Sequence, residues 1–267
     1  MRFLLLVKAT KDFEAGRPLD ETTMSKMADW TEQLIKAGAR IGADRLHPSS
    51  KATRVRYAKG QVRVTDGPFA ESKELIAGYC LIQANSLNEA VGWAKRVPFE
   101  EGEIEVRPVH ELIDVPADPP AGRPGTTRYL GMVKSDPEVE AGKFPDEKSV
   151  ADMGAFLGEA AKAGVFVSGQ ALQPSSKGAR VRYSGRNRLV IDGPFAEAKE
   201  LVAGFMLLQF ASKDEAVEWA KRFVQVDAPG RHGGESECEI RPIYEFEDYD
   251  PSPAVERFRK MGIGTKN

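Results

Sequence analysis

Short apolar runs alternate with amphipathic stretches along the chain, and the same order occurs twice. Residues 2–8 and 128–134 are apolar runs of strand length. Each is followed, after a loop, by apolar residues at helical spacing, which predicts a helix packed on a sheet. The two stripes are Met24, Met27, Trp30 and Leu34 in the first copy, and Val150, Met153, Phe156 and Ala160 in the second.

Strict alternation of polar and apolar residues marks the strands that follow. Residues 54–57 and 180–183 both read Arg-Val-Arg-Tyr, and a glycine close behind each predicts the turn of a hairpin. Further along, residues 86–89 and 212–215 are Ser-x-x-Glu sequences, which are typical of a helix start. A second helix is therefore expected in each copy, before a final alternating strand.

A nine-residue signature shows that the two halves of the chain are copies of one module. Residues 66–74 read DGPFAESKE, and residues 192–200 read DGPFAEAKE, 126 positions later (192 minus 66). We predict a first module at 1–114, a linker rich in proline and glycine at 115–126, a second module at 127–248, and a C-terminal tail with a short helix at 249–267.

The order of the predicted elements gives a fold for each copy. Strand, helix, hairpin, strand, helix and strand form an α+β module of the ferredoxin-like kind, with an antiparallel sheet and both helices on one face. The chain has 267 residues, which is enough for two such modules with a core each.

Composition and charge narrow the range of partners. The net charge of −2 gives no basic field for a phosphate backbone, so nucleic acid is not expected as a partner. No apolar run reaches the length of a membrane span, and no membrane partner is expected. Cys80 and Cys238 lie in apolar, strand-like runs, which indicates buried thiols in a reducing compartment and a cytoplasmic protein.

Neither copy contains a spaced cluster of histidines and cysteines, or a glycine-rich loop that follows a strand and opens a helix. We therefore expect neither a bound metal nor a cofactor.

The signature resembles the DGPFAETKE motif of the YCII-related family, also called DGPF-domain proteins. Each copy differs from the motif at one position, Ser72 in the first and Ala198 in the second. The resemblance implies a fold of the dimeric α/β-barrel type, in which two ferredoxin-like units place the open faces of their sheets together. Family members usually pair between chains, so the tandem copies are expected to pair within this one. The expected assembly is a monomer with an internal pseudo-dimer or a higher homo-oligomer.

A histidine and aspartate pair is proposed as catalytic in some relatives of this superfamily. None of His47, His110 and His232 is repeated in this chain, which argues against a histidine mechanism shared by both copies. His232 lies in a glycine-rich insertion of the second copy, which is either a lid over a cleft or a surface loop without a ligand.

Strand parity gives the candidate binding residues. In the alternating strands, valine and tyrosine point to one face and the charged residues to the other. If the apolar face meets the helices, the charged face turns toward a cleft between the modules and favours a carboxylate or phosphate. The alternative is a solvated face with cross-strand Arg–Glu pairs. The candidates are Arg54, Arg56, Arg107, Arg180, Arg182 and Arg241.

The signature adds further candidates. Asp66 and Asp192 precede a rigid Gly-Pro turn, either as a catalytic base or ligand beside the cleft or as an Asx-turn cap. Lys73 and Lys199 line the same cleft or are simply solvated.

Three hypotheses about function follow. In the first, a small anionic organic molecule is bound or transformed between the modules by cofactor-free acid–base chemistry, as the resemblance to barrel-type lyases, isomerases and dehydrochlorinases implies. In the second, the protein is a non-enzymatic interaction or regulatory protein with a protein partner. The resemblance supports this reading because family members are often encoded beside alternative sigma factors. In the third, one copy holds a site and the other is its structural mate.

Overall fold

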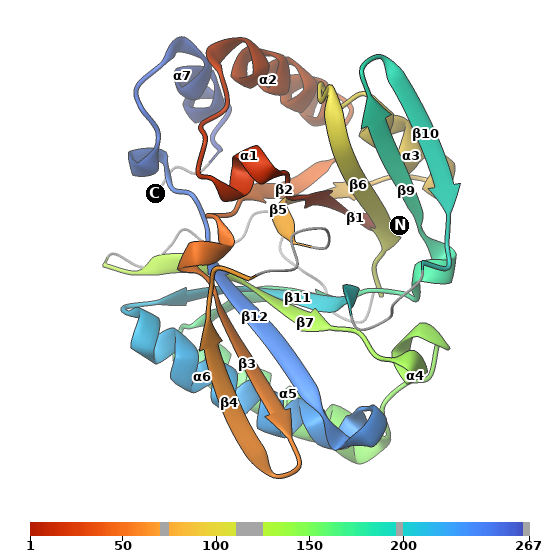
Figure 1. Ribbon diagram of the computed structural model, residues 1–267, viewed down its shortest axis with the longest axis vertical. Helices are drawn as coiled ribbons and strands as arrows, with labels where there is room; N and C mark the ends of the chain where they lie inside the picture. Colours follow the sequence, from red (N-terminus) through yellow and green to blue (C-terminus); the bar gives the residue numbers. More distant parts are fainter. Residues whose placement is uncertain (70–74, 111–124, 196–199, 264–267) are drawn as a thin grey trace.

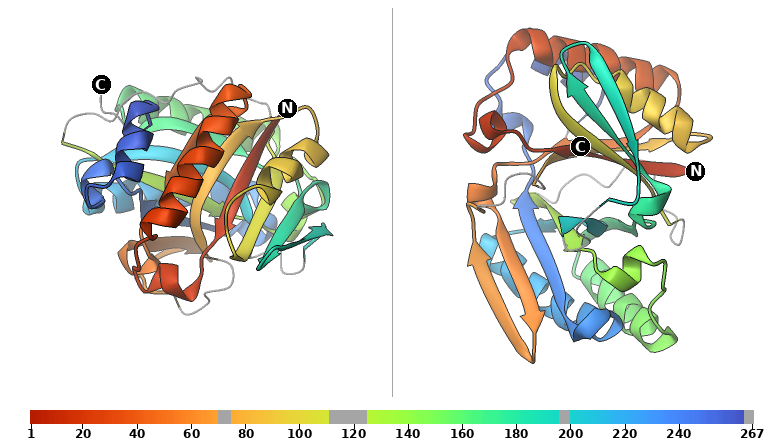
Figure 2. Two further views of the ribbon diagram at one scale, coloured as in Figure 1. Left: turned by 90° about the horizontal axis from the view of Figure 1, so that it is seen from above. Right: turned by 45° about the vertical axis from the view of Figure 1, so that its right-hand side comes forward.

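The computed structural model describes residues 1–69, 75–110, 125–195 and 200–263. Two six-stranded antiparallel sheets lie face to face, and each carries helices on its outer side (Figure 1, Figure 2). This confirms the predicted α+β architecture of two ferredoxin-like modules paired within one chain. In the described residues, no helix is both long enough and apolar enough to cross a membrane.

The strands and helices follow the predicted order. In spatial order, the first sheet consists of β10 (Asn187–Asp192), β9 (Ala179–Ser184), β6 (Glu101–Pro108), β1 (Arg2–Lys8), β5 (Ile76–Gln83) and β2 (Arg40–Arg45). The second consists of β4 (Gln61–Asp66), β3 (Thr53–Ala58), β12 (Ser236–Pro242), β7 (Thr127–Lys134), β11 (Val202–Phe210) and β8 (Phe166–Ala171). The helices are α1 (Lys11–Glu14), α2 (Glu21–Lys36), α3 (Leu87–Lys95), α4 (Pro137–Glu140), α5 (Glu147–Lys162), α6 (Lys213–Asp227) and α7 (Pro253–Lys260).

Helix starts lie where the sequence places caps. Asp20 and Asp146 accept hydrogen bonds from backbone N–H groups in the first turns of α2 and α5. Ser86 and Ser212 do the same for α3 and α6. Each cap satisfies a backbone donor that a helix N-terminus leaves without a partner, so these four starts are fixed locally.

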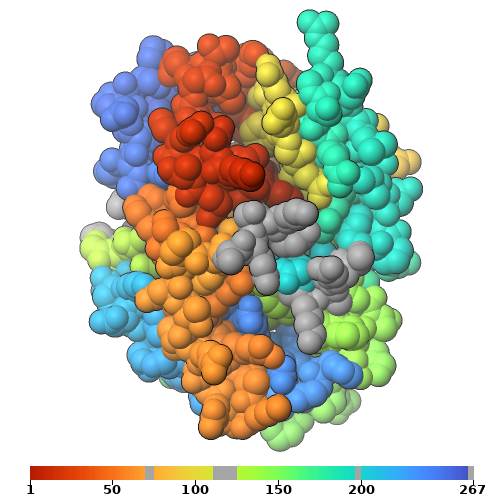
Figure 3. Space-filling model, in the orientation of Figure 1, coloured from red at the N-terminus to blue at the C-terminus, as the bar shows by residue number. Residues whose placement is uncertain are grey.

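The two modules exchange their hairpins. The hairpin β3–β4 of the first module pairs with β12 of the second, where Val55 lies opposite Cys238. The hairpin β9–β10 of the second module pairs with β6 of the first, where Val181 lies opposite Ile104. In the space-filling view, the first module's hairpin reaches the far end of the second module (Figure 3). Each sheet is therefore built from both copies.

Apolar side chains form three cores. Two lie between a sheet and its helices, and each of these contains a valine from the other module's hairpin, Val181 in the first and Val55 in the second. The third lies between the two sheets and includes Leu4, Leu6 and Leu130. The open faces of the sheets therefore meet through an apolar core, as the pseudo-dimer prediction requires.

The C-terminal tail docks on its own chain. Helix α7 lies beside α2 (Figure 2), and Arg257 of α7 donates hydrogen bonds to Asp29 at 2.7 Å and Glu32 at 2.9 Å. The backbone N–H of Ala254 donates to Glu21 at the start of α2. The predicted short helix is thus a further layer over the first module.

Candidate functional site

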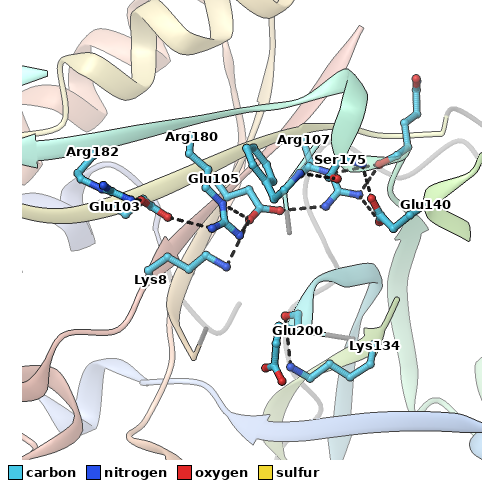
Figure 4. Close-up of polar contacts among 12 residues, drawn as sticks. Lys8, Glu103, Glu105, Arg107, Lys134, Glu140, Ser175, Arg180, Arg182 and Glu200 are labelled. Carbon is cyan, nitrogen blue, oxygen red and sulfur yellow. Dashed lines mark hydrogen bonds and ion pairs between the residues drawn. The ribbon is translucent and has the colours of Figure 1, made fainter. Parts of the chain in front are cut away.

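The six candidate arginines fall into two polar clusters that the internal repeat relates. The first polar cluster consists of Lys8, Glu103, Glu105, Arg107, Glu140, Arg180 and Arg182 (Figure 4). The second polar cluster consists of Glu14, Arg54, Arg56, Lys134, Glu235, Glu239 and Arg241. Both contain residues of both modules, because the exchanged hairpins bring their arginines to the last strand of the other copy.

Glu105 is the centre of the first polar cluster. Its carboxylate accepts hydrogen bonds from Arg107 Nη1 at 2.9 Å and Arg180 Nη2 at 2.8 Å, and Lys8 Nζ lies 3.3 Å away (Figure 4). Burial alone would raise the pKa of Glu105, but the charges of Lys8, Arg107 and Arg180 outweigh it and lower the pKa to about 2. The carboxylate is therefore ionised and fully engaged.

Glu239 has the same place in the second polar cluster. It accepts hydrogen bonds from Arg54 Nε at 2.9 Å and from Arg241 Nη2. Arg241 also donates to the carbonyl of Ile76 at 2.6 Å. Burial acts to raise the pKa of Glu239, and the charges of Arg241, Arg54 and Lys134 lower it overall.

All six predicted arginines are ion-paired with glutamates. Arg107 and Arg241 are completely buried, whereas the side chains of Arg56 and Arg182 are about half exposed and pair with Glu235 and Glu103. The four hairpin arginines pair with glutamates on or next to the last strand of the other copy, in line with the cross-strand pairs of the alternative considered for the sequence. Arg107 and Arg241 instead pair with glutamates of their own strands and are not solvated. A ligand carboxylate at these arginines would have to replace a glutamate that already holds the position.

The described part of the signature supports these clusters. The guanidinium of Arg54 lies 4.0 Å from the ring centre of Phe69, and Arg180 lies 4.2 Å from that of Phe195. A side chain at Gly67 would overlap the carbonyl oxygen of Ser49, since an added Cβ would lie 1.8 Å from it. The phenylalanines of the signature thus pack on arginines of the two clusters, and Gly67 permits the close approach of the backbone to Ser49. Two other candidates of the signature, Lys73 and Lys199, lie outside the described residues.

The two signature aspartates have different surroundings. Asp66 accepts hydrogen bonds from Lys213 Nζ at 2.8 Å and Thr53 Oγ1 at 2.6 Å, which lower its pKa. Its side chain is 62% exposed, so it is a solvated, ionised carboxylate. At the positions that match Thr53 and Lys213, the other copy has Ala179 and Leu87, and these contacts are not repeated at Asp192.

The histidines are not equivalent either. His47 stacks on Tyr244 with ring centres 3.9 Å apart, and its Nε2 lies 3.3 Å from Asp248 Oδ2. Burial lowers the pKa of His47, helped by Lys51 and opposed by Asp248. His232 is exposed, with its Nδ1 3.7 Å from Glu138. Neither of these histidine–carboxylate pairs is repeated at the matched positions of the other module.

A cavity of about 620 Å³ lies between α2 and the outer face of the first sheet, a place the sequence did not indicate. Leu5, Val7 and Ile104 belong to its sheet side, and Met27 belongs to its helix side. Phe258 of α7 belongs to the lining contributed by the tail. These apolar positions face the helices, whereas Lys8 and Glu103 of the first polar cluster also belong to the lining.

The same region of the second module is filled, leaving a void of about 20 Å³. The difference can be followed position by position, because the repeat offset matches the residues around the two spaces. Thr31, Arg40, Cys80 and Val97 line the cavity, and their counterparts Leu157, Phe166, Met206 and Phe223 line the void. The second module therefore carries larger or more apolar side chains at four matched positions.

The second helix of each module adds to this asymmetry. Helix α6 spans 15 residues and α3 only nine, so Phe223 belongs to a helix whereas Val97 follows the end of one. The insertion after α6 then lies against the start of α5, where an added Cβ at Gly230 would lie 3.0 Å from Ser149 Cβ. The glycine-rich loop of His232 thus belongs to the packing of the second module.

Two lysines were not singled out in the sequence. Lys8 is ion-paired with Glu105, whereas its counterpart Lys134 donates to the carbonyl of Glu200 at 3.5 Å (Figure 4). Burial lowers the pKa of Lys134, against the opposing charge of Glu239. Neither this difference nor the cavity has a motif. A comparison of the two copies at matched positions would have indicated the cavity, whereas it shows lysine at both Lys8 and Lys134.

Comparisons with known proteins agree with this architecture. The model of the YCII-related domain matches residues 1–113 and again residues 127–247. A curated protein of Rhizobium meliloti (strain 1021), named as the uncharacterized protein R00369, is 36% identical over 93 residues. That alignment covers 34% of this chain and 75% of the relative.

Proposed function

The chain belongs to the YCII-related family and carries its domain twice, and on this premise we propose that it binds one small organic anion per chain, in the cavity of its first module. The observation that carries the proposal is the cavity of about 620 Å³ between α2 and the first sheet. Ligand pockets are typically a few hundred to about 1,000 Å³ and mainly apolar, with few polar groups. The volume of this cavity fits that range, and its lining combines an apolar sheet side with several charged residues.

The contrast between the modules supports a dedicated site. Both copies derive from one repeated sequence, and the second shows that this fold can fill the space with ordinary side chains such as Leu157 and Met206. The first has Thr31 and Cys80 at those positions, and interiors are normally close-packed. One copy that holds a site beside a structural mate is the third hypothesis drawn from the sequence, and we adopt it.

The cleft between the modules is less favourable for the ligand. The sheet faces meet there through an apolar core, and the arginines at its edges pair with Glu103, Glu105, Glu235 and Glu239. We therefore place the ligand on the helix side of the first sheet.

Acid–base chemistry on the bound molecule stays a prediction. Asp44 and Glu103 are carboxylates at the cavity. Cys80 is less suited to chemistry, because burial raises the pKa of its thiol to about 12, despite the nearby positive charge of Arg40. A neutral thiol is a poor nucleophile, so its contribution is to the shape of the cavity.

The test uses phenylnaphthylamine, an uncharged probe whose fluorescence rises in apolar surroundings. We expect saturable binding of one probe per chain. Thr31→Leu combined with Cys80→Met introduces the second module's own side chains and should weaken binding by about tenfold, since the added groups occupy the space of the probe.

Val64→Met serves as the control, because it adds a comparable side chain on the exposed strand β4 and should leave affinity unchanged. Circular dichroism and thermal unfolding confirm that each variant is folded. Absence of saturable binding to the unaltered protein, or equal affinity in a folded double variant, would overturn the proposal and leave the interaction protein as the function to pursue.

A further inference from the structure

We infer that Arg40 recognises the acidic group of the ligand in this cavity, so that the ligand class is a compact, mainly apolar organic acid. This rests on the proposed function and adds to it the residue that selects the charge. The inference starts from one side chain on the edge strand β2, whose guanidinium belongs to the cavity wall.

The guanidinium of Arg40 lacks the partners that such groups normally have inside proteins. Its Nε is buried and makes no hydrogen bond to the described residues. The structure also gives the Arg40 side chain no ion pair within the described part of the chain. A buried donor without an acceptor costs about 1–3 kcal/mol, and more when it is charged, so an acceptor at this place is favoured.

Two of the carboxylates that line the cavity already have partners. Asp44 accepts from the hydroxyl of Tyr79 at 2.6 Å and pairs with Arg128 at 3.1 Å. Glu103 pairs with Arg180 and Arg182.

Three further arginines at the cavity have partners as well. Arg128 also binds Glu245 at 2.9 Å, and Arg17 pairs with Asp12. Arg45 lies over the rings of Phe13 and Tyr244 and donates to the carbonyl of Arg17. Lys26 also belongs to the lining, but its side chain is exposed. Arg40 is thus the cation at the cavity with a buried donor left for an incoming acid.

The second module supports this assignment. Arg40 and Phe166 occupy the same place in their sheets, since Arg40 lies opposite Ile82 and Phe166 lies opposite the matching Leu208. Phe166 packs into the filled core of its module. In the second module, which has no such cavity, this position therefore holds the apolar ring of Phe166. In the first module, where the cavity is present, the same position holds Arg40. A solvated arginine on an edge strand would not require the cavity beside it.

The chemistry of the Arg40 guanidinium favours an oxyanion as its partner. A guanidinium offers parallel N–H donors that match the two oxygens of a carboxylate, and it binds sulfonate and phosphate in the same manner. Leu5, Val7 and Ile104 supply apolar contact for the rest of the molecule. We expect acids with one charged group and a compact apolar body to bind more tightly than their neutral analogues.

The experiment compares two probes with the same ring system. Anilinonaphthalene sulfonate carries one sulfonate, and phenylnaphthylamine is its uncharged counterpart. Both are titrated into the unaltered protein, Arg40→Gln, Arg40→Lys and the control Arg186→Gln, which changes an exposed hairpin residue. We expect Arg40→Gln to weaken the sulfonate by at least about tenfold and the uncharged probe by less than about twofold. Arg40→Lys should bind the sulfonate more tightly than Arg40→Gln but less tightly than the unaltered protein, because it keeps the positive charge but lacks the parallel N–H donors of the guanidinium.

The outcomes separate this inference from the proposed function. If the uncharged probe binds and the sulfonate affinity is the same in Arg40→Gln as in the unaltered protein, the assignment of Arg40 is overturned while the cavity stands. If neither probe binds the unaltered protein, both ideas fall together. If both probes weaken equally in a folded Arg40→Gln variant, Arg40 shapes the cavity and does not select charge, and the inference is again overturned.

Discussion

Glu105 holds the first polar cluster together through three cations, at 1% exposure. Replacing it by glutamine leaves Arg107, which is completely buried, without its carboxylate. Breaking a buried pair on one side is strongly destabilising, so we expect Glu105→Gln to lower the free energy of unfolding by on the order of 3 kcal/mol at pH 7. Urea unfolding measures this. Glu101→Gln, at an exposed position of the same strand, should change it by less than about 0.5 kcal/mol, and an equal loss in both variants would contradict the argument.

The same carboxylate makes stability depend on pH. The pKa of Glu105 is about 2 in the folded chain and 4.5 for an ordinary glutamate. Because the folded pKa is the lower one, the contribution is fully present above pH 4.5 and is lost as pH falls toward 2. We expect the difference in Tm between the unaltered protein and Glu105→Gln to shrink between pH 6 and pH 3. A constant difference across this range would show that the ionised form is not what stabilises the cluster.

Parity along the strands correctly placed Arg54 and Arg180 on the face opposite Val55 and Val181. It did not predict the partners of the arginines, because those lie on strands of the other copy. Arg40 lies in a stretch of β2 without strict alternation and was not singled out. Its proposed role depends on the residues that surround it in three dimensions, and neither the hydrophobic pattern nor the composition of the sequence reveals these neighbours.

The exchanged hairpins are the elements that join the modules. Val181 belongs to the second module by sequence, but it is completely buried in the core between the first sheet and α3. Val181→Ala should therefore lower stability by about 2 kcal/mol and should reduce hydrogen-exchange protection in α3 and β6 more than in α6. The mirror variant Val55→Ala should do the reverse, since Val55 lies in the core of the second module. Protection lost within the mutated residue's own sequence module would contradict the exchange.

Helices and strands were predictable because their signals are local. Caps at Asp20, Ser86 and their copies, and the alternation at residues 53–58, each depend on a few neighbouring residues. Sheet membership is not local: the final strands β6 and β12 read almost alike, and either could accept either hairpin by pattern alone. The exchange of hairpins therefore depends on how the two copies pack together in three dimensions.

At the scale of the whole molecule, the copies have diverged while remaining dependent on each other. The resemblance predicted a pseudo-dimer, and the apolar core between the sheets shows it. Each sheet takes four strands from one copy and two from the other. Each sheet thus includes its partner's hairpin, whereas the cavity lies against the first sheet alone, with Arg128 of the second module and Phe258 of the tail in its lining. The division of the chain at 115–126 remains a prediction about sequence, and it does not define two independent folding units.

Cutting the chain in its linker tests this dependence. We expect fragments 1–118 and 119–267 to co-purify as a one-to-one complex when they are expressed together, because the pairs β12–β3 and β6–β9 and the core between the sheets hold them without a covalent link. Each fragment alone exposes those surfaces and should lack a cooperative thermal transition as a monomer. Light scattering and calorimetry on the separate and joint preparations distinguish the cases. Two fragments that each melt cooperatively as monomers would show that every copy can close its sheet with its own hairpin, and the exchange would then follow from tandem linkage and would not be a requirement of the fold.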